Sequence, residues 1–86
     1  MPAKPGACAR LGIFPDADWA AQVGQLLLPK SEQKGGLTWV VRAYPGQRYY
    51  VVFSGLDADA LAQRLTARKA LLRRRVTASA HPEGCS

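Results

Sequence analysis

The chain contains a segment, from Gln47 to Leu65, that predicts a β-strand, a short turn and an α-helix in direct succession. Residues Tyr49 to Phe53 are dense in β-branched and aromatic side chains, which favour a pleated, half-buried surface. A serine and a glycine end this run, and Asp57 stands where a helix needs an N-cap residue. Leu61 and Leu65 then follow at helical spacing.

An earlier segment repeats this plan. Cys8 to Phe14 is a short apolar run, and the glycine inside it indicates a β-bulge or a close approach of two backbones. Asp16 or Asp18 can cap the helix that follows. The two copies begin about forty residues apart, and two units are too few for a solenoid, so the repetition favours a compact pseudo-symmetric domain. The apolar stripe of the first helix contains Trp19, Val23, Leu26 and Leu27.

Between the two copies the sequence predicts a β-hairpin. Leu37 to Tyr44 and Arg48 to Phe53 have the composition of strands. Pro45 to Gln47 can form the turn, because proline presets its first central position and glycine tolerates a positive φ. The first helix is expected to run from Asp18 to Leu28, where Pro29 ends it.

The second helix is expected from Asp57 to about Leu71, and a short last strand is expected to end at Val76 and Thr77. These elements predict an α+β fold: one βαββαβ domain with a four-stranded antiparallel sheet and both helices on one face, as in ferredoxin-like and RNP-like domains. The domain is expected to span residues 8–77, after a disordered segment 1–7 and before a flexible tail 78–86. The expected core contains Trp19, Val23, Leu26, Trp39, Val41, Val51, Phe53, Leu61 and Leu65.

Strand alternation leaves one set of side chains on the sheet face that the helices do not cover. Such a face is either an ordinary solvated surface or a binding surface. Arginine forks and flat tyrosine rings can together contact the hydroxyl groups and the apolar faces of sugar rings. The side chains on this face that we expect to bind a ligand are Arg10, Arg42, Tyr44, Arg48 and Tyr50.

The net charge of +6 favours an anionic or polar partner, or serves solubility alone. Much of the excess lies in the run from Arg73 to Arg75, which is typical of a solvated surface. The two cysteines, Cys8 and Cys85, and the single His81 are not spaced as a metal site. The cysteines either form one disulfide in an oxidising compartment or stand apart, Cys8 as a small apolar strand residue and Cys85 in the tail. We expect that folding requires no disulfide.

No pattern in the sequence predicts catalysis or a cofactor. Helix capping explains the aspartates near the two helix starts better than paired-carboxylate glycosidase chemistry does. A Gly-rich phosphate loop and a nucleophile elbow are both absent from the sequence, so a non-enzyme without metal or cofactor is expected.

The sequence also bears on location. No run approaches the roughly 20 apolar residues of a membrane span, so no membrane insertion is expected in this segment. The first residues lack the pattern of a signal peptide. The chain is therefore expected either to be cytoplasmic or to be a mature or excised part of an exported protein. We expect a monomer.

Two stretches resemble the SPOR domain, the small βαββαβ module named after sporulation-related repeats. C-A-R-L-G-I-F resembles the family's opening strand, with Gly12 and Phe14 in the places of its glycine and phenylalanine. R-Y-Y-V-V-F-S-G-L-D-A-D-A-L-A-Q-R-L resembles its third strand, turn and second helix, and the likeness covers about residues 8–77. The chain departs from the family at Arg10, often a glutamine, and at Tyr50, often an arginine. Those departures affect the details of a ligand site and not the fold.

The resemblance implies a function, because SPOR domains bind peptidoglycan glycan strands that lack stem peptides. It implies a binding module in the periplasm or cell envelope, as part of a larger or exported protein. Many members of the family are found at the division septum. Without the resemblance, the cytoplasm is the expected location.

Two other classes of protein stay open. A four-stranded sheet with helices behind it and aromatic residues in front is also the plan of RNA-recognition domains. The central-strand signature of those domains is absent, which makes RNA or DNA the weaker candidate. A protein-interaction module can use the same open sheet face or an edge strand.

Overall fold

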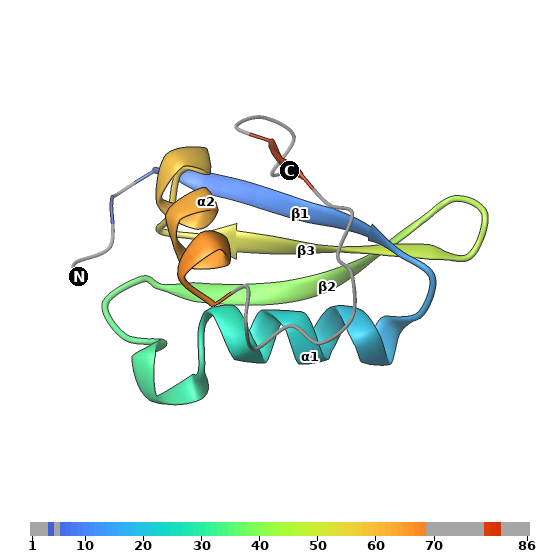
Figure 1. Ribbon diagram of the computed structural model, residues 1–86, viewed down its shortest axis with the longest axis horizontal. Helices are drawn as coiled ribbons and strands as arrows, with labels where there is room; N and C mark the ends of the chain where they lie inside the picture. Colours follow the sequence, from blue (N-terminus) through green and yellow to red (C-terminus); the bar gives the residue numbers. More distant parts are fainter. Residues whose placement is uncertain (1–3, 5, 69–78, 82–86) are drawn as a thin grey trace.

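The structure is a computed structural model that describes Lys4, residues 6–68 and residues 79–81. These residues form a small α+β domain with two helices and an antiparallel sheet of three long strands (Figure 1). The elements in chain order are β1 (Cys8–Phe14), α1 (Ala17–Leu27), the short 3-10 helix η1 (Lys30–Glu32), β2 (Thr38–Tyr44), β3 (Arg48–Ser54), α2 (Ala58–Ala67) and β4 (Ser79–His81). The predicted α+β class, both helices and the first three strands are confirmed.

Strand β3 lies between β2 and β1, and it is antiparallel to both. The turn between β2 and β3 has positive φ angles of 88° at Gly46 and 59° at Gln47, as a tight hairpin requires. The three-residue β4 pairs antiparallel with the other edge of β1, where His81 lies opposite Arg10. The last strand expected at Val76 and Thr77 lies outside the described residues, as do Arg73 to Arg75 and the expected end of the second helix near Leu71.

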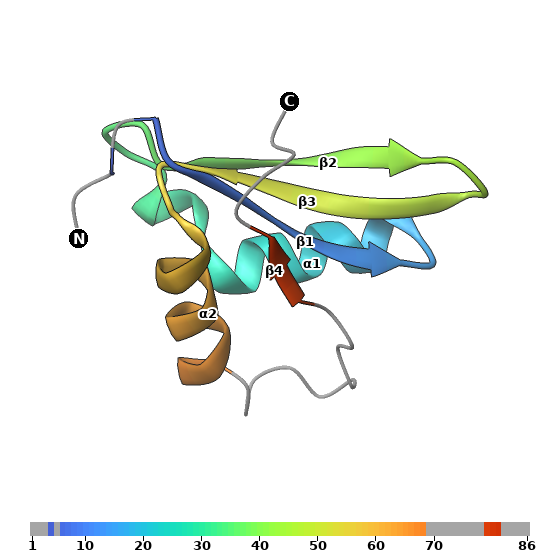
Figure 2. The same ribbon diagram turned by 90° about the horizontal axis from the view of Figure 1, so that it is seen from above.

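Both helices lie on the same side of the sheet, so the sheet has one covered face and one open face (Figure 2). This arrangement was expected because each helix has only one apolar stripe. The core lies between the helices and the covered face. Of the predicted core residues, Val23, Val51, Phe53 and Leu61 are buried, and Trp19, Trp39, Val41 and Leu65 pack against them while partly exposed. Leu26 is only half-buried, and the core also contains Ala9, Leu11, Phe14, Ala20, Leu27, Leu28, Leu37 and Leu56.

Each helix begins at an aspartate whose carboxylate accepts a hydrogen bond from a backbone N–H of the first turn. Asp16 accepts from the N–H of Trp19 at 2.6 Å, and Asp57 accepts from the N–H of Ala60 at 2.8 Å. The ammonium group of Lys4 lies 2.9 Å from the Asp57 carboxylate. The hydrogen bond from Lys4, together with that backbone N–H, lowers the pKa of Asp57 below its ordinary value of 3.8. Lys4 is therefore tied to the start of α2.

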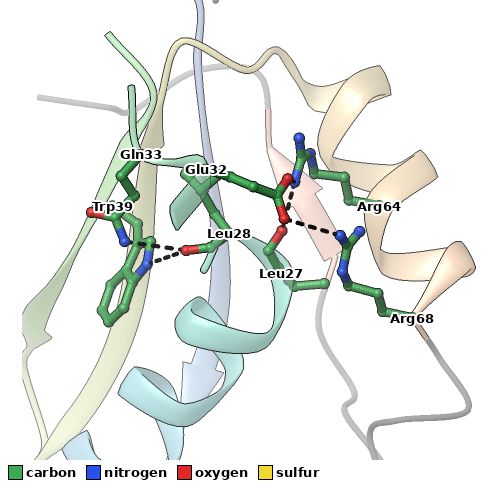
Figure 3. Close-up of polar contacts among 7 residues, drawn as sticks. All are labelled: Leu27, Leu28, Glu32, Gln33, Trp39, Arg64 and Arg68. Carbon is green, nitrogen blue, oxygen red and sulfur yellow. Dashed lines mark hydrogen bonds and ion pairs between the residues drawn. The ribbon is translucent and has the colours of Figure 1, made fainter. Parts of the chain in front are cut away.

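The C-terminal end of α1 is held by side chains from distant parts of the chain (Figure 3). Pro29 cannot continue the helix, so the last carbonyl groups of α1 need partners from elsewhere. The carbonyl oxygen of Leu28 accepts hydrogen bonds from the indole Nε1 of Trp39 at 3.0 Å and from the amide of Gln33 at 3.2 Å. The carbonyl oxygen of Leu27 accepts one from the guanidinium of Arg64 at 2.9 Å. Strand β2 and helix α2 therefore both attach to one helix end.

The Trp39 ring reaches the Leu28 carbonyl by lying against Gly24 of α1. A Cβ atom at Gly24 would lie 2.7 Å from the nearest ring atom of Trp39, closer than carbon atoms can approach. Glycine is a poor helix former, so Gly24 lowers the intrinsic stability of α1. Its missing side chain, however, provides the space that the indole ring occupies.

We predict that Gly24→Ala destabilises the domain by roughly 1–3 kcal/mol through overpacking, although alanine is the better helix former by roughly 1 kcal/mol. Denaturant unfolding measures the change. In a Trp39→Leu background the same substitution should cost much less, because the ring that it meets is gone. A more stable Gly24→Ala protein would show that the indole ring does not lie against α1.

Arg64 also contacts the Glu32 carboxylate at 2.9 Å, whereas Arg68 reaches the other oxygen of that carboxylate only at 3.5 Å. The Arg64 side chain is 13% exposed and that of Arg68 is 26% exposed. We predict that Arg64→Ala lowers the free energy of unfolding by roughly 2–3 kcal/mol, because the Leu27 carbonyl then loses a charged donor.

Arg68→Ala removes the same charge from the C-cap of the same helix and serves as the matched control. It should cost less than about 1 kcal/mol, because its contact is long and partly solvated. Equal losses in the two variants would mean that the Leu27 carbonyl contact does not stabilise the domain.

Candidate functional site

The open face of the sheet carries the side chains that alternate with the core. In the register of the strands, Gly12 of β1, Tyr50 of β3 and Arg42 of β2 form one row across the sheet. The neighbouring row consists of Arg10, Val52 and Val40. The predicted placement of Arg10, Arg42 and Tyr50 on this face is therefore confirmed. Val52 is 4% exposed, whereas Val40 is 46% exposed.

A register shift interrupts β1 on this face. Gly12 pairs with Tyr50 and Phe14 pairs with Tyr49, so Ile13 is the extra residue of a β-bulge. Leu11 and Phe14 are both buried, although they are three positions apart, while Ile13 is 43% exposed. The glycine in this strand led us to expect either a bulge or a close approach of two backbones, and the structure shows a bulge next to Gly12. The bulge gives the open face an apolar side chain that regular alternation would place in the core.

A hollow of about 250 Å³ lies on the open face and is lined by Arg10, Gly12, Ile13, Tyr44 and Tyr50. The rings of Tyr44 and Tyr50 meet edge to face, with centroids 6.0 Å apart and planes at 82°. The Arg10 guanidinium lies over the Tyr50 ring, 5.5 Å from its centroid, in a cation–π contact. The three side chains thus hold one another in place.

Gly12 makes this arrangement possible. A Cβ atom at Gly12 would lie 2.7 Å from the Cβ of Tyr50 and 3.1 Å from its Cα. Only a residue without a side chain lets β1 and β3 approach so closely at this row. The absent side chain also leaves the floor of the hollow open.

The structure brings three of the five predicted site residues together, namely Arg10, Tyr44 and Tyr50. Arg42 is exposed in the same row as Tyr50 but does not line the hollow. Arg48 lies opposite Tyr44 and lines a neighbouring hollow of about 420 Å³ at the hairpin end of the sheet. Two lining residues, Gly12 and Ile13, were not predicted as site residues.

The acidic residues in the described part of the chain lie away from the strands of the sheet. Three arginines, Arg10, Arg42 and Arg48, lie on strands that contribute to the open face. Each acidic residue in the described part of the chain lies instead at a helix start or in η1. These residues are Asp16, Asp18, Glu32, Asp57 and Asp59. The hollow therefore offers guanidinium N–H donors and phenol groups, but no carboxylate among its lining residues.

Cys8 forms a disulfide bond, so the interpretation of this residue as an unpaired strand cysteine is corrected. The only other cysteine in the sequence, Cys85, lies outside the described residues. That interpretation assumed that the expected tail, residues 78–86, has no anchor. In the structure β4 pairs with β1, and His81 lies opposite Arg10, two residues from Cys8.

Within the described ranges, no helix is long and apolar enough to cross a bilayer, and no group of three His, Cys, Asp or Glu side chains could hold a metal ion. Comparison with protein-family models, curated proteins and solved structures finds no match to this chain.

We predict that Gly12→Ala lowers the melting temperature by several degrees, because the new methyl group displaces Tyr50 and separates β1 from β3. Thermal unfolding measures the effect. In a Tyr50→Gly background most of the cost should vanish, since the nearest contact is the Tyr50 Cβ. If the two substitutions lowered the melting temperature additively in the double variant, the close approach of these two residues would be contradicted.

Proposed function

We propose that this domain is a SPOR-like module that binds peptidoglycan glycan strands lacking stem peptides. The hollow on the open sheet face is the observation that carries the proposal, because it combines exposed aromatic surface with a guanidinium group. Pyranose rings have apolar C–H faces and polar edges, and they suit a surface of this composition. Arg42 and Arg48 flank the hollow and would extend the contact along a glycan strand.

The rings of the two tyrosines have different roles in this proposal. Arg10 covers one face of the Tyr50 ring, so Tyr50 positions the guanidinium and is not the main sugar platform. Tyr44 is 43% exposed and lies beside Ile13, which is exposed to the same extent. We therefore assign the stacking contact to Tyr44 and the apolar wall to Ile13.

We also propose that the domain works in the bacterial periplasm or cell envelope, within a larger exported protein, and in particular at the division septum. The Cys8 disulfide supports this location, because disulfides persist in oxidising compartments such as the periplasm. The pairing of β4 with β1 supports a four-stranded, ferredoxin-like sheet as the complete fold. A monomer that binds glycan without catalysing a reaction fits a surface hollow of this kind.

The proposal is tested by binding to purified peptidoglycan sacculi before and after treatment with an amidase that removes stem peptides. We predict that Tyr44→Ala weakens binding to treated sacculi by roughly tenfold or more, corresponding to the loss of about 1.4 kcal/mol of stacking. The melting temperature should change little, because Tyr44 is exposed.

Val40→Ala is the matched control, because Val40 is exposed on the same strand and the same face but outside the hollow. It should bind like the parent domain. If the parent binds neither treated nor untreated sacculi, the glycan proposal is wrong. Retention on single-stranded RNA or DNA would then favour the nucleic-acid alternative, in which the arginines contact phosphates.

A further inference from the structure

The hollow contains hydrogen-bond donors in excess of acceptors. The guanidinium group of Arg10 has five N–H donors and accepts no hydrogen bond. No carboxylate of the described residues forms an ion pair with Arg10. The hydroxyl groups of Tyr44 and Tyr50 are the only side-chain acceptors among the lining residues. A ligand that pairs with the N–H donors of Arg10 must therefore carry a hydrogen-bond acceptor. A carboxylate matches the geometry of the guanidinium group best.

Peptidoglycan glycan acquires such a group only when its stem peptide is removed. The stem peptide is attached through an amide to the lactyl group of each muramic acid residue. Hydrolysis of that amide consumes one water, releases the peptide with a free amino group and leaves a lactyl carboxylate on the glycan. The new carboxylate stands on a short branch beside a methyl group, at the edge of a pyranose ring.

We propose that Arg10 recognises this lactyl carboxylate, which makes the hollow a reader of the group that distinguishes bare glycan from glycan with peptides. This inference rests on the proposed function. Tyr50 supports the guanidinium from one face at 5.5 Å and leaves the N–H groups at its edge available for a bidentate contact. Ile13 and Tyr44 provide the apolar surface for the lactyl methyl group and the adjacent sugar face.

The size and charge of the site fit this assignment. A hollow of about 250 Å³ lies below the range of roughly 300–1,000 Å³ typical of pockets for drug-sized ligands, so it suits one sugar residue with its branch. Arg42 and Arg48 add positive charge on the same face, and the acidic residues of the described chain lie at the helix starts and in η1. Arg10 therefore faces no competing carboxylate from these elements. A lactyl group that is still in amide linkage to a stem peptide has no carboxylate for Arg10 to bind.

The test uses soluble glycan strands released from amidase-treated sacculi, which carry no carboxyl groups other than the lactyl ones. One half is treated with carbodiimide and ammonia, which converts each carboxylate to a neutral amide, and the other half is mock-treated. We predict that the parent domain binds the amidated strands roughly 10- to 100-fold more weakly than the mock-treated strands. Arg10→Gln should bind both preparations equally and weakly, and Arg10→Lys should keep part of the preference.

Lys34→Gln is the control, because it removes one positive charge from an exposed loop away from the hollow. It should retain the full preference of the parent. Equal binding of the parent to both preparations would overturn the carboxylate assignment and leave the glycan proposal in place. A preference that survives in Arg10→Gln would assign the carboxylate to another residue. Binding of the parent to neither preparation would remove the proposed function, and this inference with it.

Discussion

The C-terminal carbonyl groups of α1 are the point on which the described part of the structure depends. Proline ends this helix, and its last carbonyls lie under two other elements where water cannot serve all of them. Trp39 brings β2 to the Leu28 carbonyl, and Arg64 brings α2 to the Leu27 carbonyl. The two strand–helix copies are thus joined by hydrogen bonds as well as by apolar packing. Because β2 is fixed at its beginning, the hairpin that carries Tyr44 at the other end of the strand has a defined position.

The same helices explain the charge of the open face. Each helix start uses acidic residues, where they satisfy backbone N–H groups and complement the positive end of the helix dipole. The carboxylate of Glu32 in η1 forms ion pairs with Arg64 and Arg68. The carboxylates of Asp16, Asp57 and Glu32 are thereby engaged away from the hollow, and no ion pair in the described part of the chain joins an acidic residue to the arginines of the strands. The cationic character of the open face arises here from the capping of helices as much as from the composition of the sheet.

Much of the fold was predictable because two simple periodicities decide it. The alternation in Arg48 to Phe53 and the stripe of Trp19, Val23 and Leu27 assign the faces that bury apolar surface. The features that were missed lack a period. Leu28, Leu37 and Leu56 lie beyond the regular elements, so only the assembled core identifies them as buried. The site was predicted in part, since alternation places Arg10, Tyr44 and Tyr50 on one face but cannot bring Ile13 there.

The bulge at Ile13 lets β1 carry one more residue than regular pairing with β3 allows, without exchanging its two faces. Before the bulge, odd-numbered positions face the core, and after it the phase is reversed, which is how Leu11 and Phe14 are both buried. Removing Ile13 would restore regular alternation and leave both large side chains on the covered face, two positions apart. A deletion elsewhere in β1 would instead turn the side chains on one side of it to the opposite face. The bulge is therefore the one place in this strand where a change of length would spare the core and alter only the open face.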